Sequence, residues 1–572
     1  MHAPQPIKPG DPSAPAAPTT SPPHSAVSTQ FKFAALGLLA VGTAAFGLAG
    51  PKIRGALGIG ATQTADLSRP PVKLDRIKGP LATGGGLGIN LVYQAYWSSQ
   101  FAFVDLLAQS SEWLPQEVEG WTWDTGQPLE LSPDGWPLQL APGQAAGKLM
   151  ARGLGGNYPG GLYHLEWDGI GTWEVLGDGK IVNSQTYRHA IRVTPTDGGL
   201  HIKLTSTKPK DPVRNVRLVR DGHRKDYLEQ PFAPEFLEWL EPFDVLRFMD
   251  WQRTNDSTQT EWGQRVLPGQ DTQSGPQGVA LEYCIALGNA LEKDIWLCVP
   301  HLADDDYVRQ MAELVHESLD KDLVCHVEFS NEVWNSQFSQ AQWSEREGLK
   351  LKLSENPFQA RLLNYARRST QVFELWRDVF GKSAKSRLVC VLAGQAVNPW
   401  TAEVILGAPG AAEQADAYAV APYFGSSLGS PENAARTKSY STDQLFEALD
   451  QDLTKVLDAV HRTVKVAADH DLPLIAYEAG QHLAGHGGVE SDDTQTARFK
   501  GANRDPRMGE LYTRLLETWA TIGGRTICMW NSIETWSKWG SWGLVEFLDT
   551  PREKAPKLDA TLDFAEQRER WW

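Results

Sequence analysis

Eight short apolar runs, each ending in polar residues, constrain the fold of this chain more than any other feature of its sequence. Helical stretches separate the last seven runs. The runs are LGINLVYQAYW (87–97), FDVLRFMDW (243–251), DIWLCVPHL (294–302), VCHVEFSNE (324–332), SRLVCVLAG (386–394), ADAYAVAPYF (415–424), LPLIAYEAG (472–480) and RTICMWNS (525–532). Eight alternating strand–helix units predict an α/β protein built on a (β/α)8 TIM barrel.

A long Gly- and Trp-rich stretch separates the first run from the second. FAFVDLLAQSSEW, residues 101–113, is expected to form the helix after strand 1. Residues 116–229 then hold short alternating segments such as GLYHLEWDG and GLHIKLTS, with DG and GG turn signals between them. We therefore predict an antiparallel β-module, residues 116–229, inserted between strands 1 and 2 of a catalytic barrel formed by residues 84–115 and 230–572.

The N-terminal part of the chain differs in composition from the rest. Residues 1–32 are rich in Pro, Ala, Ser and Thr and are predicted to be disordered, and residues 51–83 are predicted to be a linker. Residues 33–50, FAALGLLAVGTAAFGLAG, carry no charge and approach the length of a membrane-spanning helix. A signal anchor and a late-cleaved signal peptide are both open, and a buried helix is a third reading. The first two predict an exported protein, anchored in the membrane at the cell surface or periplasm, or secreted.

Charge and cysteine content exclude several classes of partner. The formal net charge is −16 and no dense Lys/Arg stripe occurs, which argues against nucleic acid and is compatible with a neutral substrate. The five cysteines have no zinc spacing, and their odd number does not suggest a disulfide framework. The acidic run at 303–306 fits calcium or, more simply, the N-terminal cap of the next helix. We expect neither a metal nor a cofactor.

Two carboxylates end strands of the predicted barrel. Glu332 ends strand four and Glu478 ends strand seven. Active sites of such barrels lie at the carboxyl ends of the strands, so the two side chains can meet at one mouth. Either one alone could be a solvated surface carboxylate. Other polar or aromatic residues at strand ends are Arg247 on strand two, His301 on strand three, Asn331 on strand four, Tyr423 on strand six and Trp530 on strand eight.

This order of residues resembles glycoside hydrolase clan A, the retaining (β/α)8 glycosidases that include cellulases, mannanases and xylanases. The resemblance covers about residues 235–545 and the first strand, and leaves out the β-module and the N-terminus. It implies that Glu332, which follows Asn331 in EFSNEVWN, is the general acid/base. It also implies that Glu478, in IAYEAGQH, is the nucleophile.

The same resemblance assigns roles to four more residues. It implies that Arg247 orients a carboxylate, and that His301 contacts a sugar hydroxyl. It makes Tyr423 the hydrogen-bond partner of the nucleophile, and Trp530 the platform under the sugar. Without the resemblance, Arg247 would be read as an ion-pair partner inside the barrel, facing Glu328, and His301 as an ordinary loop histidine.

The chemistry gives an independent reason to pair the two carboxylates. Retaining hydrolysis needs one ionised carboxylate to attack the anomeric carbon and one protonated carboxyl to give the leaving oxygen its proton. Hydrogen bonds from Arg and Tyr favour the charged form of Glu478. The charge on Glu478 and aromatic walls such as Trp334 should raise the pKa of Glu332. Asn331 offers an amide to the sugar 2-hydroxyl.

The loop TWSKWGSWG, residues 535–543, places three tryptophans after strand eight: Trp536, Trp539 and Trp542. Spaced aromatic rings among Gly and Ser suit stacking on sugar faces. Packing against the inserted module would explain them equally well.

The sequence as a whole predicts a retaining glycoside hydrolase that cleaves β-linked poly- or oligosaccharides. A retaining α-L-arabinofuranosidase has the same two carboxylates and is one alternative. A non-catalytic carbohydrate-binding barrel protein is another, and the presence of both carboxylates counts against it. The sequence does not reveal the sugar, the linkage or the oligomeric state.

Overall fold

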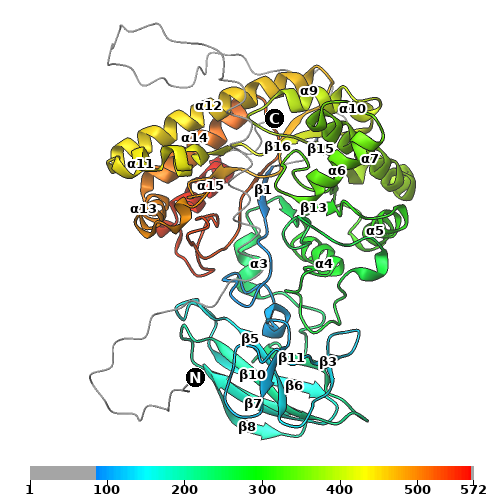
Figure 1. Ribbon diagram of the computed structural model, residues 1–572, viewed down its shortest axis with the longest axis vertical. Coiled ribbons are helices and arrows are strands. Elements are labelled where there is room, and N and C mark those ends of the chain that lie inside the picture. The colour runs from blue at the N-terminus through cyan, green and yellow to red at the C-terminus, as the bar shows by residue number, and fades with distance from the viewer. Residues whose placement is uncertain (1–80, 82–85, 568–572) are drawn as a thin grey trace, which may run out of the picture.

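The computed structural model describes Leu81 and residues 86–567, which form a closed barrel and an antiparallel β-module (Figure 1). Each barrel strand lies within one of the eight predicted runs, and every neighbouring pair is parallel. The strands, in barrel order, are β1 (Leu87–Asn90), β12 (Val245–Arg247), β13 (Asp294–Val299), β14 (Cys325–Phe329), β15 (Leu388–Ala393), β16 (Ala417–Val420), β18 (Leu474–Ala476) and β20 (Ile527–Met529). The predicted (β/α)8 fold is confirmed.

The barrel strands are apolar throughout because both of their faces are covered. On β13, Trp296 and Cys298 point into the barrel, where they pack with alternate residues of the other strands. Ile295 and Leu297 belong to the layer between the strands and the surrounding helices. Parallel strands buried on both faces read as continuous hydrophobic runs, which is why the sequence shows them so clearly.

Helices follow the strands around the outside of the barrel (Figure 1). The run at 303–306 acts as a helix cap, as predicted: the Asp304 carboxylate accepts from the Tyr307 amide at 2.7 Å. The α-helices are α3 (Pro234–Leu240), α4 (Leu281–Leu291), α5 (Asp305–Ser318), α6 (Ser339–Lys350), α7 (Pro357–Phe380), α8 (Ala384–Arg387), α9 (Trp400–Leu406), α10 (Ala411–Gln414), α11 (Pro431–Ser439), α12 (Thr442–Ala468), α13 (Asp493–Arg504), α14 (Pro506–Thr521) and α15 (Pro556–Gln567).

Between β1 and β12 the chain forms the predicted β-module, which lies beside the barrel in Figure 1. Two four-stranded antiparallel sheets share a core that includes Trp167, Trp173 and Leu204. One sheet has the order β2 (Leu114–Glu117), β5 (Gln144–Met150), β10 (Leu200–Thr207) and β7 (Gly171–Gly177), and the other has β11 (Arg214–Arg220), β6 (Gly161–Asp168), β9 (Arg188–Val193) and β8 (Gly179–Gln185). The short pairs are β3 (Glu130–Leu131) with β4 (Pro137–Gln139), and β17 (Tyr423–Phe424) with β19 (Gly480–Gln481).

The predicted helix over residues 101–113 is wrong. The chain there makes only one short 3-10 turn, η2 (Leu106–Gln109). Phe103 and Asp105 form isolated bridges to Phe232 and Val219 instead, so tertiary pairing with the end of the module replaces the helix. The apolar pattern is real, since Leu106 and Leu107 are buried in the core of the module.

The N-terminal predictions fall on a part of the chain that the structure does not describe. Residues 1–32 and 33–50 lie outside it, as does the 51–83 linker apart from Leu81. Within residues 86–567, no helix is long and apolar enough to cross a membrane. All five cysteines are buried and unpaired.

Candidate active site

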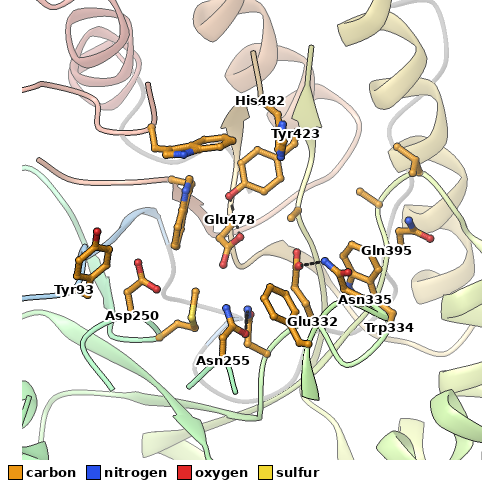
Figure 2. A pocket seen from close by; sticks show the side chains of 18 of the residues that line it. Tyr93, Asp250, Asn255, Glu332, Trp334, Asn335, Gln395, Tyr423, Glu478 and His482 are labelled. Atoms are coloured by element: carbon orange, nitrogen blue, oxygen red, sulfur yellow. Dashed lines mark hydrogen bonds between the residues drawn. The ribbon is translucent and has the colours of Figure 1, made fainter. Parts of the chain in front are cut away.

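A cavity at the carboxyl ends of the barrel strands contains both predicted carboxylates (Figure 2). Glu332 follows β14 and Glu478 follows β18, and Figure 2 shows the two side chains pointing into the same space. The cavity is lined by Tyr93, Met249, Asp250, Arg253, Asn255, Asn331, Glu332, Trp334, Asn335, Phe338, Gln395, Ala396, Val397, Ala421, Tyr423, Glu478, His482, Trp530 and Trp542. Residues far apart in the sequence therefore lie together at the carboxyl end of the barrel, as predicted from their positions at strand ends.

The backbone after β14 turns sharply to present Glu332. Ser330 and Glu332 both have left-handed backbone conformations, with φ angles of 61° and 42°. Non-glycine residues seldom adopt such angles, and they are found where the surrounding structure holds them in place. The Gln340 amide does this from α6 by donating to the Asn331 carbonyl at 2.9 Å. The turn thus fixes where the Glu332 carboxyl group lies.

Arg247 lies fully buried at the end of β12 and connects the elements of the site. Its Nη1 donates to Glu478 Oε1 at 2.8 Å and to Asn90 Oδ1 at 2.9 Å. Its Nη2 donates to Glu328 Oε2 at 3.0 Å and to Asn331 Oδ1 at 2.8 Å. The predicted pairing of Glu328 with an inward-facing arginine is confirmed. Arg247 therefore does both things that the sequence suggested: it forms an ion pair inside the barrel with Glu328, and it holds the carboxylate of Glu478.

Glu478 is buried with a cation and a phenol in contact. Arg247 holds Oε1, and the Tyr423 hydroxyl donates to Oε2 at 2.9 Å. Burial raises the pKa of Glu478, while Arg247 and the Tyr423 hydrogen bond oppose that rise. Both partners stabilise the charged form of Glu478, whereas no cation among the described residues contacts Glu332 in this way.

Glu332 is buried among neutral groups. The Asn335 amide donates to Oε2 at 2.9 Å, and the Tyr477 hydroxyl donates to Oε1 at 3.1 Å. Trp334 in turn donates to the Tyr477 oxygen at 3.3 Å. Burial and then the charge on Glu478 raise the pKa of Glu332 to about 8. The direction agrees with the sequence-based expectation, and near neutral pH Glu332 carries the proton.

Three other predicted residues line the same cavity. Trp334 and Trp530 both line the cavity. Asn331 lines it too, with Oδ1 accepting from Arg247 and Nδ2 donating to Asn255 Oδ1 at 3.2 Å. An amide nitrogen has two protons, so Asn331 retains donor capacity toward the cavity.

His301 and two of the rim tryptophans are placed differently. His301 is buried beside Trp343 and does not line the cavity; burial lowers its pKa to about 4. Trp536 is buried under Lys557, and its Nε1 donates to the Gly543 carbonyl. Trp539 is partly exposed outside the lining. Of the three tryptophans in this loop, Trp542 is the one that lines the cavity.

The structure adds residues that the sequence analysis did not select. Asn335 and Tyr477 hold Glu332, and both lie within three residues of a chosen carboxylate. Asp250 lines the cavity at the end of the second predicted strand, and its Oδ2 has no hydrogen-bond partner. Burial raises the pKa of Asp250 to about 7, opposed by Arg253. The position of Asp250 at a strand end was a usable signal.

The described residues contain no group of three or more His, Cys, Asp or Glu side chains that could hold a metal ion.

Comparisons with known proteins find similar barrels but no close relative. No protein-family profile and no curated protein matches the chain. Among solved structures, it is similar to a 4-O-α-L-rhamnosyl-β-D-glucuronidase from Fusarium oxysporum, with 11% identity, a TM-score of 0.34 and coverage of 60% of this chain and 66% of the other. It is also similar to a Bacteroidetes-affiliated GH5 cellulase (9% identity, TM-score 0.34, 59% and 85% coverage). An endo-β-1,4-mannanase from Thermotoga petrophila gives 12% identity, a TM-score of 0.32, and 58% and 72% coverage. The strand pairing of the chain itself, rather than these scores, establishes the barrel.

Proposed function

We propose that this protein is a retaining glycoside hydrolase that cleaves β-linked poly- or oligosaccharides. One observation carries the proposal: two buried carboxyl groups at the ends of strands four and seven share a cavity but have opposite surroundings. Glu478 contacts Arg247 and keeps a negative charge, whereas Glu332 contacts neutral donors and has a pKa of about 8. Retaining hydrolysis requires one charged and one protonated carboxyl group.

The reaction would proceed by double displacement. In the first step, Glu478 attacks the anomeric carbon, the glycosidic bond breaks, and Glu332 transfers its proton to the leaving oxygen. In the second step, Glu332 takes a proton from water, and the resulting nucleophile releases the sugar from Glu478. Glu332 loses a proton in the first step and regains one from water in the second. Glu478 forms a bond to the sugar in the first step and is released in the second, so both groups return to their starting states.

The rest of the cavity suits a sugar ring. Trp530 and Trp542 line the same cavity as Glu478 and offer flat apolar surfaces, on which pyranose C–H faces pack. Asn331 can donate to the 2-hydroxyl, a contact that strengthens in the transition state of this reaction class. Tyr423 and Arg247 hold the nucleophile, whose side chain lines the cavity.

Replacing the nucleophile tests this proposal. Glu478→Ala should reduce hydrolysis of aryl β-glycosides by at least about 10⁴-fold, because the covalent step is lost. Sodium azide should restore part of the turnover and give a glycosyl azide of inverted configuration, since a small anion then fills the space of the carboxylate. The exposed helix residue Glu313 supplies the matched control, and Glu313→Ala should behave as wild type. Wild-type activity in Glu478→Ala would refute the assignment.

A further inference from the structure

Four aromatic side chains form a row that runs from the wall of the cavity to the inserted module. Tyr93 lines the cavity, and its ring centroid lies 6.5 Å from that of Trp97. Trp97 lies 4.4 Å from Tyr96, and Tyr96 lies 6.0 Å from Trp123. Of the four, Tyr93 is buried, and Tyr96, Trp97 and Trp123 are partly exposed. These four residues are called the aromatic row below.

We propose that the aromatic row binds a β-linked glycan chain that extends from the reacting sugar onto the β-module. This inference deepens the proposed function and rests on it. The rings of Tyr93 and Tyr96 meet that of Trp97 edge to face, at interplanar angles of 73° and 87°, and partly exposed aromatic rings pack against the apolar C–H faces of sugars. Arg253 lies over Tyr93 at 4.3 Å and Arg152 over Trp123 at 5.7 Å, so a donor for sugar hydroxyls accompanies each end of the row. The substrate is accordingly an oligomer or polymer.

The segment that carries Tyr93 and Trp97 is held in one conformation. The Ser98 hydroxyl donates to the Tyr93 carbonyl at 3.0 Å and accepts from the Ala95 amide at 3.0 Å. The Gln100 amide donates to the Val92 carbonyl at 2.6 Å. A binding surface that is already ordered loses less conformational entropy when a ligand arrives.

The module's end of the row is held just as firmly. Lys203, whose side chain is fully buried, donates to the carbonyls of Val118 and Gly120, each at 2.7 Å. Gln116 accepts from the Thr122 amide at 3.0 Å. Lys203 also forms an ion pair with Glu174 at 2.6 Å, so its buried charge is compensated while it holds the two loop carbonyls. That loop is the one that presents Trp123.

Tyr93, the cavity end of the row, lies on the glycone side of the bond that the proposed reaction breaks. In Figure 2, Tyr93 and Asp250 lie on one side of Glu478, whereas Asn335 and Gln395 lie beyond Glu332 on the other. Glu332 protonates the leaving group in the proposed reaction, so the leaving sugar occupies its side. The sugars that remain attached to the enzyme in the covalent step therefore extend past Tyr93.

The position of the insertion in the barrel explains how the β-module can take part in binding the glycan chain. The chain leaves β1 at the carboxyl end of the barrel, the same end that holds the cavity. An insertion at this point emerges beside the reacting groups. The row consists of residues just after β1 together with one residue of the module.

Binding without turnover is the first test. Glu332→Gln, which cannot donate a proton, is run in native gels containing mixed-linkage β-glucan, glucomannan, xyloglucan or laminarin. At least one of these polysaccharides should slow the migration of the Glu332→Gln variant through the gel. Adding Trp97→Ala or Trp123→Ala should weaken that retardation by about fivefold or more, as expected for loss of a stacking contact. Tyr187, an exposed aromatic residue of the module outside the row, is the control, and Tyr187→Ala should bind as the parent does. No retardation by any of the four, or equal retardation of the Trp variants, would overturn the inference.

Chain length gives the second test. In 4-nitrophenyl β-cello- and β-manno-oligosaccharides of one to four units, the aryl group takes the leaving-group side and every sugar lies on the glycone side. For the wild type, kcat/KM should rise with each added unit, and Trp97→Ala and Trp123→Ala should flatten that rise while Tyr187→Ala keeps it. An unchanged rise in the Trp variants contradicts the inference. Absence of hydrolysis of both series counts against the hydrolase, and the gel retardation then decides the row independently.

Discussion

The two sides of the cavity contain the same ionisable group in different surroundings. Glu478 contacts the guanidinium of Arg247 and the hydroxyl of Tyr423. Glu332 contacts the amide of Asn335 and the hydroxyl of Tyr477, and no cation. Both groups are buried, so burial alone cannot separate their roles. The contacts with Arg247 and Tyr423 favour the charged form of Glu478, and in the proposed function this difference separates the roles of the two groups.

Removing that arginine should have the largest effect. Arg247→Met leaves Glu328 and Glu478 buried without a cation, which typically costs about 3–5 kcal/mol of folding stability. The pKa of Glu478 should rise further, and kcat/KM should fall by at least about 10³-fold as the nucleophile becomes protonated. Thermal unfolding and aryl glycoside hydrolysis measure the two effects.

A control separates this effect from the loss of any ion pair. Arg377→Met removes a partly exposed pair with Asp416 on the outside of the barrel and should cost far less. If Arg247→Met does not fold, Arg247→Lys keeps a cation and should still lose part of the activity, because lysine cannot reach four acceptors at once. Full turnover in a folded Arg247 variant would show that the cation does not set the roles.

Removing the proton donor should have an effect that depends on the leaving group. Glu332→Gln should lower turnover by about 10²–10⁴-fold for glycosides with poor leaving groups, which need a proton. For 2,4-dinitrophenyl glycosides, whose leaving group needs little protonation, the first step should be affected much less. Equal losses for both leaving groups would argue that Glu332 acts in some way other than as an acid.

The smallest expected effect concerns Tyr477. Its hydroxyl donates to Glu332 and so favours the charged form, which lowers the pKa of that carboxyl group. Activity should be lost as pH rises through about 8, where Glu332 deprotonates. Tyr477→Phe removes the hydrogen bond and should move this alkaline limit to higher pH, with only a few-fold change in the maximal rate. A limit that moves to lower pH would mean that Tyr477 stabilises the neutral form instead.

The barrel and its two carboxylates could be predicted from the sequence because both depend on simple patterns. Strands buried on both faces appear as uninterrupted apolar runs, and the polar residue that ends each run lies at the mouth. Glu332 and Glu478 therefore stood out at strand ends. Arg247 could be selected on the same ground.

Contacts that depend on loops and on distant packing could not be predicted in this way. The helix expected at 101–113 is replaced by pairing with residues more than a hundred positions away. His301 follows its strand as expected, yet packing beside Trp343 turns it away from the cavity. Trp536 and Trp542 lie in the same short loop, and the fold of that loop places Trp542 in the cavity and Trp536 under Lys557.

The most direct test of the account is a carbon-13 NMR titration of labelled glutamate carboxyl groups, which needs no knowledge of the substrate. The Glu332 signal is assigned by its absence from the Glu332→Gln spectrum. Glu332 should titrate near pH 8 in the wild type and at a clearly lower pH in Glu478→Gln, where the neighbouring charge is gone. A Glu332 pKa near 4.5, or one that Glu478→Gln leaves unchanged, would contradict the assignment of acid and nucleophile.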